Sequence, residues 1–88
     1  MILFRNNMPQ IDLHGEDKIG TRIKVKTFLN DNYKLENKEV AIIHGVGKGI
    51  LKSEVLSILK HDKRVAEYNL DMFNEGCTLV RFNNKVDK

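Results

Sequence analysis

Two histidines, each followed by a glycine, close two apolar runs of this chain. His14 lies in the run at residues 11–15, and His44 lies in the run at residues 40–45. An apolar run that ends in a polar residue and glycine, and is followed by a helical pattern, is typical of a strand that leads into a helix. Both histidines are therefore expected at strand carboxyl ends, where parallel α/β sheets hold their ligands. If the two strands are neighbours, both imidazoles share one small crevice.

Two imidazoles in one crevice could serve as base and acid on a phosphodiester, because an unperturbed histidine titrates at about pH 6.5. Asp12 lies two residues before His14, so in a strand both side chains project from the same face. The carboxylate could then orient the imidazole or accept a proton. The alternative for His44 is a structural one, in which it only hydrogen-bonds the loop that follows. We assign no role to His61, which is expected to be a solvated residue at a helix end.

The loop after His44 places three glycines, Gly45, Gly47 and Gly49, at alternate positions before a helical pattern. Glycine permits positive φ and close approach of a ligand, and successive N–H groups at a helix amino terminus favour an anion. Lys48 adds a mobile positive charge, so a phosphate is the expected ligand. The spacing excludes a P-loop, which needs Ser or Thr after Gly-Lys, and a dinucleotide fingerprint. The structural alternative is a tight turn that binds nothing.

The elements that must position these residues follow the order β-α-β-α-β-β. A first amphipathic helix is expected over residues 19–33, with its apolar stripe formed by Ile19, Ile23, Val25, Leu29 and Tyr33. A second helix is expected after the glycine loop, with its stripe formed by Leu51, Val55, Ile58 and Leu59. The unbroken apolar run at 40–43 predicts a central strand that is buried on both faces. Residues 64–70 and 77–82, joined by a turn at 74–76, predict a closing antiparallel pair.

The length of 88 residues and the apolar content of 41% suit one small α/β domain. We expect residues 1–8 to form a lead-in over the sheet edge, residues 9–82 to form the domain and residues 83–88 to form a polar tail. Cys77 is the only cysteine, which excludes an internal disulfide and a multi-cysteine zinc site, and its apolar surroundings predict a buried thiol.

The net charge of +3, with 15 Lys and Arg against 12 Asp and Glu, permits a polyanionic partner without requiring one. Many of the cations fall in or beside the two predicted helices. The hydrophobic stretches are short and interrupted by charge, so no transmembrane span and no membrane partner are expected. Residues 1–4 lack the features of a targeting segment, and the cytoplasm is the expected location.

Three segments match, in order and spacing, the signatures of a known family. They read Ile-Asp-Leu-His-Gly at 11–15, His-Gly-Val-Gly-Lys-Gly at 44–49 and Gly-Cys-Thr-Leu-Val-Arg-Phe at 76–82. Over residues 8–82 the chain resembles the Smr (small MutS-related) domain, whose pattern is Leu-Asp-Leu-His-Gly, His-Gly-x-Gly-x-Gly and Gly-x-Thr-x-Val. The first helix departs from the common Thr-x-x-Glu-Ala opening, since residues 17–22 read Asp-Lys-Ile-Gly-Thr-Arg. This segment shapes the helix more than the site.

The resemblance implies a two-layer α/β sandwich with a four-stranded mixed sheet, like the carboxy-terminal domain of translation initiation factor three. It also implies an endonuclease that nicks branched DNA or cleaves RNA, including messenger RNA at ribosomes. The family's functional residues carry over to Asp12 and His14 of the first motif, and to His44, Gly45, Gly47, Lys48 and Gly49 of the second. We expect Asp12, His14 and His44 to be catalytic and the other four residues to bind the nucleic-acid phosphate.

Two reactions are compatible with these residues. On RNA, His14 or His44 would activate the 2′-hydroxyl while the other protonates the leaving oxygen, without a metal. On DNA, Asp12 with His14 would activate water, with a divalent metal ion as an optional cofactor. The competing hypothesis is a non-catalytic module that recognises nucleic-acid structure or a ribosome surface, and a third is a plain structural domain. The residues assign no metal ligands, do not choose between DNA and RNA, and leave the oligomeric state open.

Overall fold

The computed structural model describes residues 1–84. Its elements are β1 (Gln10–Asp12), α1 (Lys18–Lys34), β2 (Glu39–Ile43), α2 (Ile50–His61), β3 (Val65–Leu70) and β4 (Cys77–Phe82). This is the predicted order of elements. The expected polar tail at 83–88 lies largely outside the described residues. Neither helix of the described chain has the length and apolarity that a bilayer span requires.

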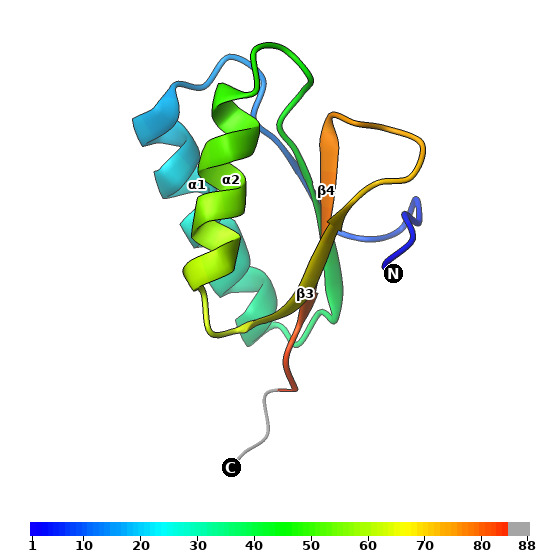
Figure 1. Ribbon diagram of the computed structural model, residues 1–88. Coiled ribbons are helices and arrows are strands. Elements are labelled where there is room, and N and C mark those ends of the chain that lie inside the picture. Colours follow the sequence, from blue (N-terminus) through cyan, green and yellow to red (C-terminus); the bar gives the residue numbers. More distant parts are fainter. Residues whose placement is uncertain (85–88) are drawn as a thin grey trace.

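The four strands form one mixed sheet in the order β1-β2-β4-β3. β1 and β2 are parallel, whereas β4 is antiparallel to both β2 and β3. Both helices cover the same face of this sheet (Figure 1). β2 lies inside the sheet, and the side chains of Val40, Ala41 and Ile42 have no exposed surface. The two-layer fold and the central strand are therefore as predicted.

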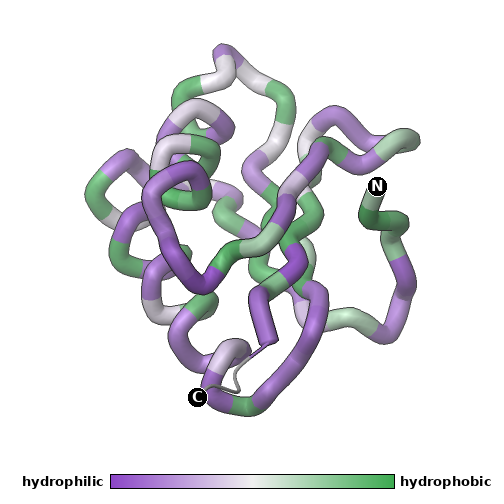
Figure 2. The backbone as a smooth tube through the Cα atoms, turned by 60° about the horizontal axis from the view of Figure 1, so that its bottom comes forward, coloured by the Kyte–Doolittle hydropathy of each residue, from purple (hydrophilic) through white to green (hydrophobic). Residues whose placement is uncertain are grey.

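The main core fills the space between the helices and the sheet. Its buried residues include Val25 and Leu29 of α1, Val55, Ile58 and Leu59 of α2, and Ile42 and Val80 of the sheet. Leu51 packs against this cluster, so the apolar stripe predicted for α2 is confirmed. Figure 2 shows hydrophobic residues along the strands in the middle of the molecule and near the N-terminus, and alternating hydrophilic and hydrophobic residues along the helices.

The apolar stripe predicted for α1 is wrong in part. Ile19 and Ile23 are 71% and 62% exposed. Since each helical residue turns by about 100°, both lie on the side of α1 opposite Val25. The buried face of α1 consists instead of Thr21, Val25, Leu29 and Asn32. Because two of these residues are polar, the packed face does not appear as an apolar pattern in the sequence.

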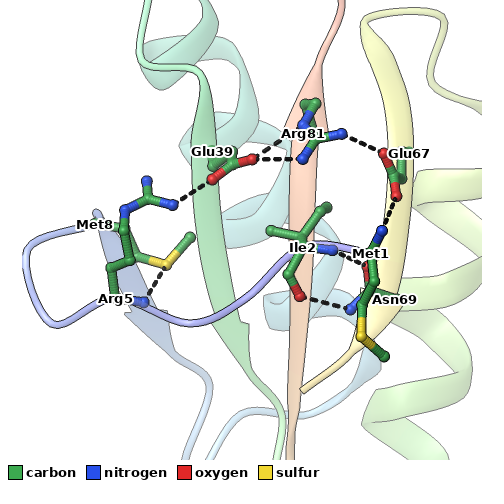
Figure 3. Close-up of polar contacts among 8 residues, drawn as sticks. All are labelled: Met1, Ile2, Arg5, Met8, Glu39, Glu67, Asn69 and Arg81. Carbon is green, nitrogen blue, oxygen red and sulfur yellow. Dashed lines mark hydrogen bonds and ion pairs between the residues drawn. The ribbon is translucent and has the colours of Figure 1, made fainter. Parts of the chain in front are cut away.

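Residues 1–8, which we call the strap, cross the face of the sheet that the helices leave open (Figure 1). Ile2 and Met8 are 1% and 4% exposed and pack with Ala41, Cys77 and Leu79 in a second apolar cluster. Figure 3 shows the strap running across β2, β4 and β3. The strap therefore covers a face of the sheet, which corrects the expectation that it lies over an edge.

Polar contacts fasten the strap at its start and in its middle. The side chain of Asn69 accepts a hydrogen bond from the N–H of Ile2 at 2.8 Å and donates one to its carbonyl at 3.1 Å. Arg5 pairs with Glu39, which also pairs with Arg81 of β4. The hydrogen bond from Arg5, together with Arg81, lowers the pKa of Glu39 despite partial burial. The strap is thus an integral part of the fold.

Candidate nucleic-acid site

The carboxyl ends of β1 and β2 lie side by side because these strands pair in parallel. Asp12 is opposite Ile43, and the N–H of Leu13 donates to the carbonyl of Ile43 at 2.9 Å. His14 and His44 follow directly after this paired end. In Figure 1 the connections that leave β1 and β2 lie together at the top of the sheet. The fold therefore brings both histidine segments to one edge.

Asp12 and His14 are both exposed at this edge. Oδ1 of Asp12 accepts a hydrogen bond from the backbone N–H of His14 at 2.9 Å. This is the local bond by which an Asp side chain forms a turn, and it ends β1. The carboxylate thus fixes the backbone of His14 and makes no hydrogen bond to its ring. Within residues 1–84 the imidazole of His14 makes no hydrogen bond or ion pair, so the ring is available to a ligand.

His44 has the opposite environment, since it is only 7% exposed. Its Nδ1 lies 2.8 Å from the carbonyl oxygen of Gly45, and its Nε2 lies 2.8 Å from Oγ1 of Thr78. A carbonyl oxygen can only accept, so Nδ1 carries the hydrogen and Nε2 accepts from the Thr78 hydroxyl. Burial lowers the pKa of His44, and the charge of Lys52 lowers it further, against the opposing effect of the Gly45 bond. The ring is therefore neutral at physiological pH.

The two imidazoles thus share a sheet edge but differ in what they can do. Both nitrogens of His44 are engaged inside the protein, whereas the ring of His14 faces solvent. This geometry fits the alternative in which His44 holds the loop after it.

The glycine loop has the backbone that its composition predicts. Gly45, Gly47 and Gly49 have φ values of 81°, 32° and 81°, a region that residues with a Cβ rarely adopt. No atom lies within 4 Å of where their Cβ atoms would be, so the surface of the loop is open. Gly49 is the N-cap of α2 and offers no side chain to the first N–H groups of the helix. These donors, with exposed Lys48 beside them, can bind an anion.

Two further residues support the loop and were not among the predicted site residues. The carbonyl of Gly76 accepts from the N–H groups of both His44 and Gly45, each at 2.9 Å. A Cβ on Gly76 would lie 3.1 Å from the Cα of Gly45, so the two segments are in close contact. Thr78, two residues on, holds the ring of His44. The signal for both was the Gly-x-Thr at the start of the third matched segment.

Cys77 takes no part in this site. It is 2% exposed, and burial raises the pKa of its thiol to about 11. The expectation of a buried thiol is therefore confirmed. In residues 1–84 no group of three or more His, Cys, Asp or Glu side chains is arranged to hold a metal ion.

Comparison with known proteins supports the match of motifs. The Smr domain model matches residues 11–83. Endonuclease MutS2 of Clostridium kluyveri is 38% identical over 76 residues, which are 86% of this chain and 10% of that protein. Endonuclease MutS2 of Clostridium tetani is 37% identical over 71 residues, which are 81% of this chain and 9% of that protein. The chain thus spans about a tenth of the length of these curated relatives.

Two crystal structures share the fold. The Smr domain of MutS2 from Thermus thermophilus superposes with a TM-score of 0.83 at 24% identity, covering 86% of this chain and 99% of that domain. YdaL, a stand-alone small MutS-related protein from Escherichia coli, also gives a TM-score of 0.83, at 21% identity, covering 89% of this chain and 66% of YdaL. These similarities establish the two-layer α/β architecture.

Proposed function

The chain belongs to the Smr domain family, and from that premise we propose that it is an endonuclease that cleaves phosphodiesters in RNA or branched DNA. The observation that carries the proposal is the pairing of β1 with β2, which puts the exposed imidazole of His14 at the same sheet edge as the open glycine loop. Relatives that are named endonucleases support the same reading. We propose residues 9–82 as the functional domain, the cytoplasm as its location and messenger RNA at ribosomes as one substrate.

The glycine loop would hold the phosphate. Gly45, Gly47 and Gly49 leave the backbone open to a ligand, and the uncapped N–H groups of α2 point toward the loop. Such donors, together with Lys48, would stabilise the negative charge that develops on the phosphorus oxygens in the transition state.

His14 would act as the general base. On RNA its imidazole would take the proton of the 2′-hydroxyl, the 2′-oxygen would attack phosphorus and the 5′-oxygen would leave with a proton from solvent. On DNA the nucleophile would be water, and Asp12 would help to position it. A divalent ion that assists on DNA would draw its ligands from Asp12 and the substrate phosphates, as magnesium ions often do.

His44 would act as a positioning residue. Its bonds to Gly45 and Thr78 fix the start of the glycine loop, and both ring nitrogens are already used. We therefore revise the hypothesis that His14 and His44 form an acid–base pair, and keep the chemistry on Asp12 and His14.

The second candidate function is a non-catalytic module that binds nucleic-acid structure or a ribosome surface. The engagement of both nitrogens of His44 favours this candidate, because it leaves one available imidazole at the edge. Both candidates use the same loop and predict salt-sensitive binding with little dependence on base sequence.

Purified chain incubated with labelled RNA and with branched DNA, with and without chelator, tests the proposal. We expect cleavage that His14→Ala slows about 10²-fold or more, the usual effect of losing a general base, while affinity is largely kept. His44→Ala should weaken binding but leave the single-turnover rate at saturation nearly unchanged. Lys38→Gln, at the opposite end of β2, is the control and should match the parent chain.

Three results would change the assignment. Cleavage that survives His14→Ala would contradict the role of His14. A loss of saturating rate in His44→Ala equal to that in His14→Ala would restore the acid–base pair. Binding of either nucleic acid without any cleavage would establish the binding module instead.

A further inference from the structure

The groove between α1 and α2 is a basic surface that lies outside the strand-end site. Three hollows follow one another along it and share lining residues. The hollow beside the glycine loop, lined by Lys48 and Gly49, shares Lys18 and Glu54 with the next. That hollow in turn shares Arg22 with the third, of about 410 Å³, near the end of α2. The hollows therefore form a row from the glycine loop to the far end of α2.

A row of cations lines the α1 side of this groove. Lys18, Arg22 and Lys26 are four residues apart and line its successive hollows. Neighbours in such a row are separated by about 6 Å along the helix axis. Lys63 continues the row beyond the end of α2. With Lys48 at the near end, positive charge recurs along the whole groove.

The acidic groups of the groove are already paired, whereas its lysines are not. Glu54 pairs with Arg22, and Asp62 pairs with Arg64. Asp17 accepts the N–H of Gly20 and caps α1. The lysines of the groove, which are all exposed and make no ion pair within the described chain, are Lys18, Lys26, Lys48 and Lys63. Their charge is therefore available to an external anion, and that of Lys26 also helps to lower the pKa of Asp62.

We propose that this groove is a track for the phosphate backbone of a nucleic-acid strand that continues from the glycine loop, an inference that rests on the proposed function. The 12 residues of α2 span about 18 Å, which corresponds to about five phosphates of a stacked strand at ~3.4 Å each. A row of exposed lysines with mobile side chains suits a partner that carries a charge on every nucleotide. The groove would then contact the phosphate backbone of several nucleotides, and cleavage would take place at one end of the track.

Salt-dependent binding tests the track. The double variant Lys26→Gln with Lys63→Gln removes two of its charges, far from the glycine loop. The matched control, Lys38→Gln with Lys60→Gln, removes two exposed charges that line none of the three hollows and make no ion pair within the described chain. Affinity for the labelled branched DNA of the cleavage assay is measured over a range of salt concentrations. Each lost phosphate contact should reduce the magnitude of the slope of log affinity against log salt by about 0.9. The slope should therefore fall by ~2 in the track variant, which lacks two lysines, and stay unchanged in the control.

A second pair of variants separates charge from packing. Lys26→Arg with Lys63→Arg should keep the slope of the parent chain, because both cations remain. Equal slopes in the parent chain, track variant and control would overturn the track while leaving the proposed function standing. An equal loss in the track variant and the control would also overturn it, since binding would then follow net charge alone. No salt-dependent binding by the parent chain would instead remove the proposed function, and the track with it.

Discussion

His44 is a buried side chain that links the glycine loop to the sheet and makes the stability of the fold depend on pH. Its ring donates to Gly45 and accepts from Thr78, so the neutral tautomer satisfies both partners. A protonated ring would carry its charge away from water and near Lys52. The folded state therefore favours the neutral form, which lowers the pKa of His44.

This lowered pKa predicts a loss of stability under mildly acidic conditions. Below the ordinary value of 6.5, the unfolded chain binds a proton at residue 44 that the folded chain takes up only at lower pH. The free energy of unfolding should therefore fall as pH drops through 6.5 and level off below the folded pKa. Urea unfolding measured from about pH 7.5 to about pH 5 checks this. The pKa values of Glu39 and Asp62 are lowered from 4.5 and 3.8, so both stay ionised over this interval.

Two histidine variants test whether His44 causes the predicted loss of stability. His44→Gln removes the titrating group and should flatten the pH dependence of stability in this interval. His61→Gln keeps His44 in its buried position and should retain the dependence. The same slope in His44→Gln and the parent chain would show that another group is responsible.

At the scale of elements, the turn between β3 and β4 supports the glycine loop that follows β2. Gly76, at the end of this turn, accepts the N–H groups of both His44 and Gly45. The two connections thus form one unit, although 30 residues of sequence separate them. A substitution in the turn should therefore alter the conformation of the glycine loop.

Gly76→Ala tests this dependence. The new Cβ would lie 3.1 Å from the Cα of Gly45 and 3.2 Å from its carbonyl carbon, so backbone must move. We expect a loss of about 1–3 kcal/mol of stability, the usual cost of overpacking, together with weaker oligonucleotide binding. Glu75→Ala, at the exposed neighbouring position, should change neither chemical unfolding nor binding. Unchanged binding in Gly76→Ala would show that the loop does not depend on the turn.

The buried face of a helix or strand could be predicted from the sequence where that face consists of apolar residues. Leu51, Val55, Ile58 and Leu59 identified the packed face of α2, and the run before His44 identified the central strand. In α1 the exposed Ile19 and Ile23 suggested a wrong face, because the true one includes buried Thr21 and Asn32. Hydrophobic periodicity shows only where the apolar residues of a helix lie, whereas the buried side of the helix is the one that packs against the sheet.

The candidate site was predictable in its location but not in its hydrogen bonds. Strand-His-Gly-helix repeats placed His14 and His44 at strand ends, and the pairing of β1 with β2 brings those ends together. No local pattern could show that Thr78, 34 residues after His44, would hold its ring. That contact depends on the register of β2 against β4, in which Thr78 is opposite Ile42.

At the scale of the molecule, the sheet has helices on one face and only the strap on the other. Ile2 and Met8 cover Cys77 and its neighbours there, and this cover is far thinner than two helices. Access to Cys77 should therefore report whether the strap is in place.

Thiol labelling tests the strap. The Cys77 thiol is buried and its pKa is raised to about 11, so the parent chain should react slowly, since the thiolate is the reactive form. Ile2→Ala removes the main apolar contact, and we expect a loss of about 2 kcal/mol of stability and faster labelling of Cys77. Leu3→Ala, at a position that is 57% exposed, should label at the parent rate. Equal rates in both variants would mean that the strap does not protect the thiol.

The shortness of β1 determines which part of the molecule unfolds first on heating. β1 has three residues and lies at the edge of the sheet, bonded only to β2. Edge segments with few ladder bonds open locally at a lower free energy than the core. Such an opening would carry Asp12 and His14 away from the glycine loop while the helices and the other strands stay folded. Amide hydrogens at the end of β1 should then exchange before those of β2, and activity should be lost below the temperature at which the chain unfolds as a whole.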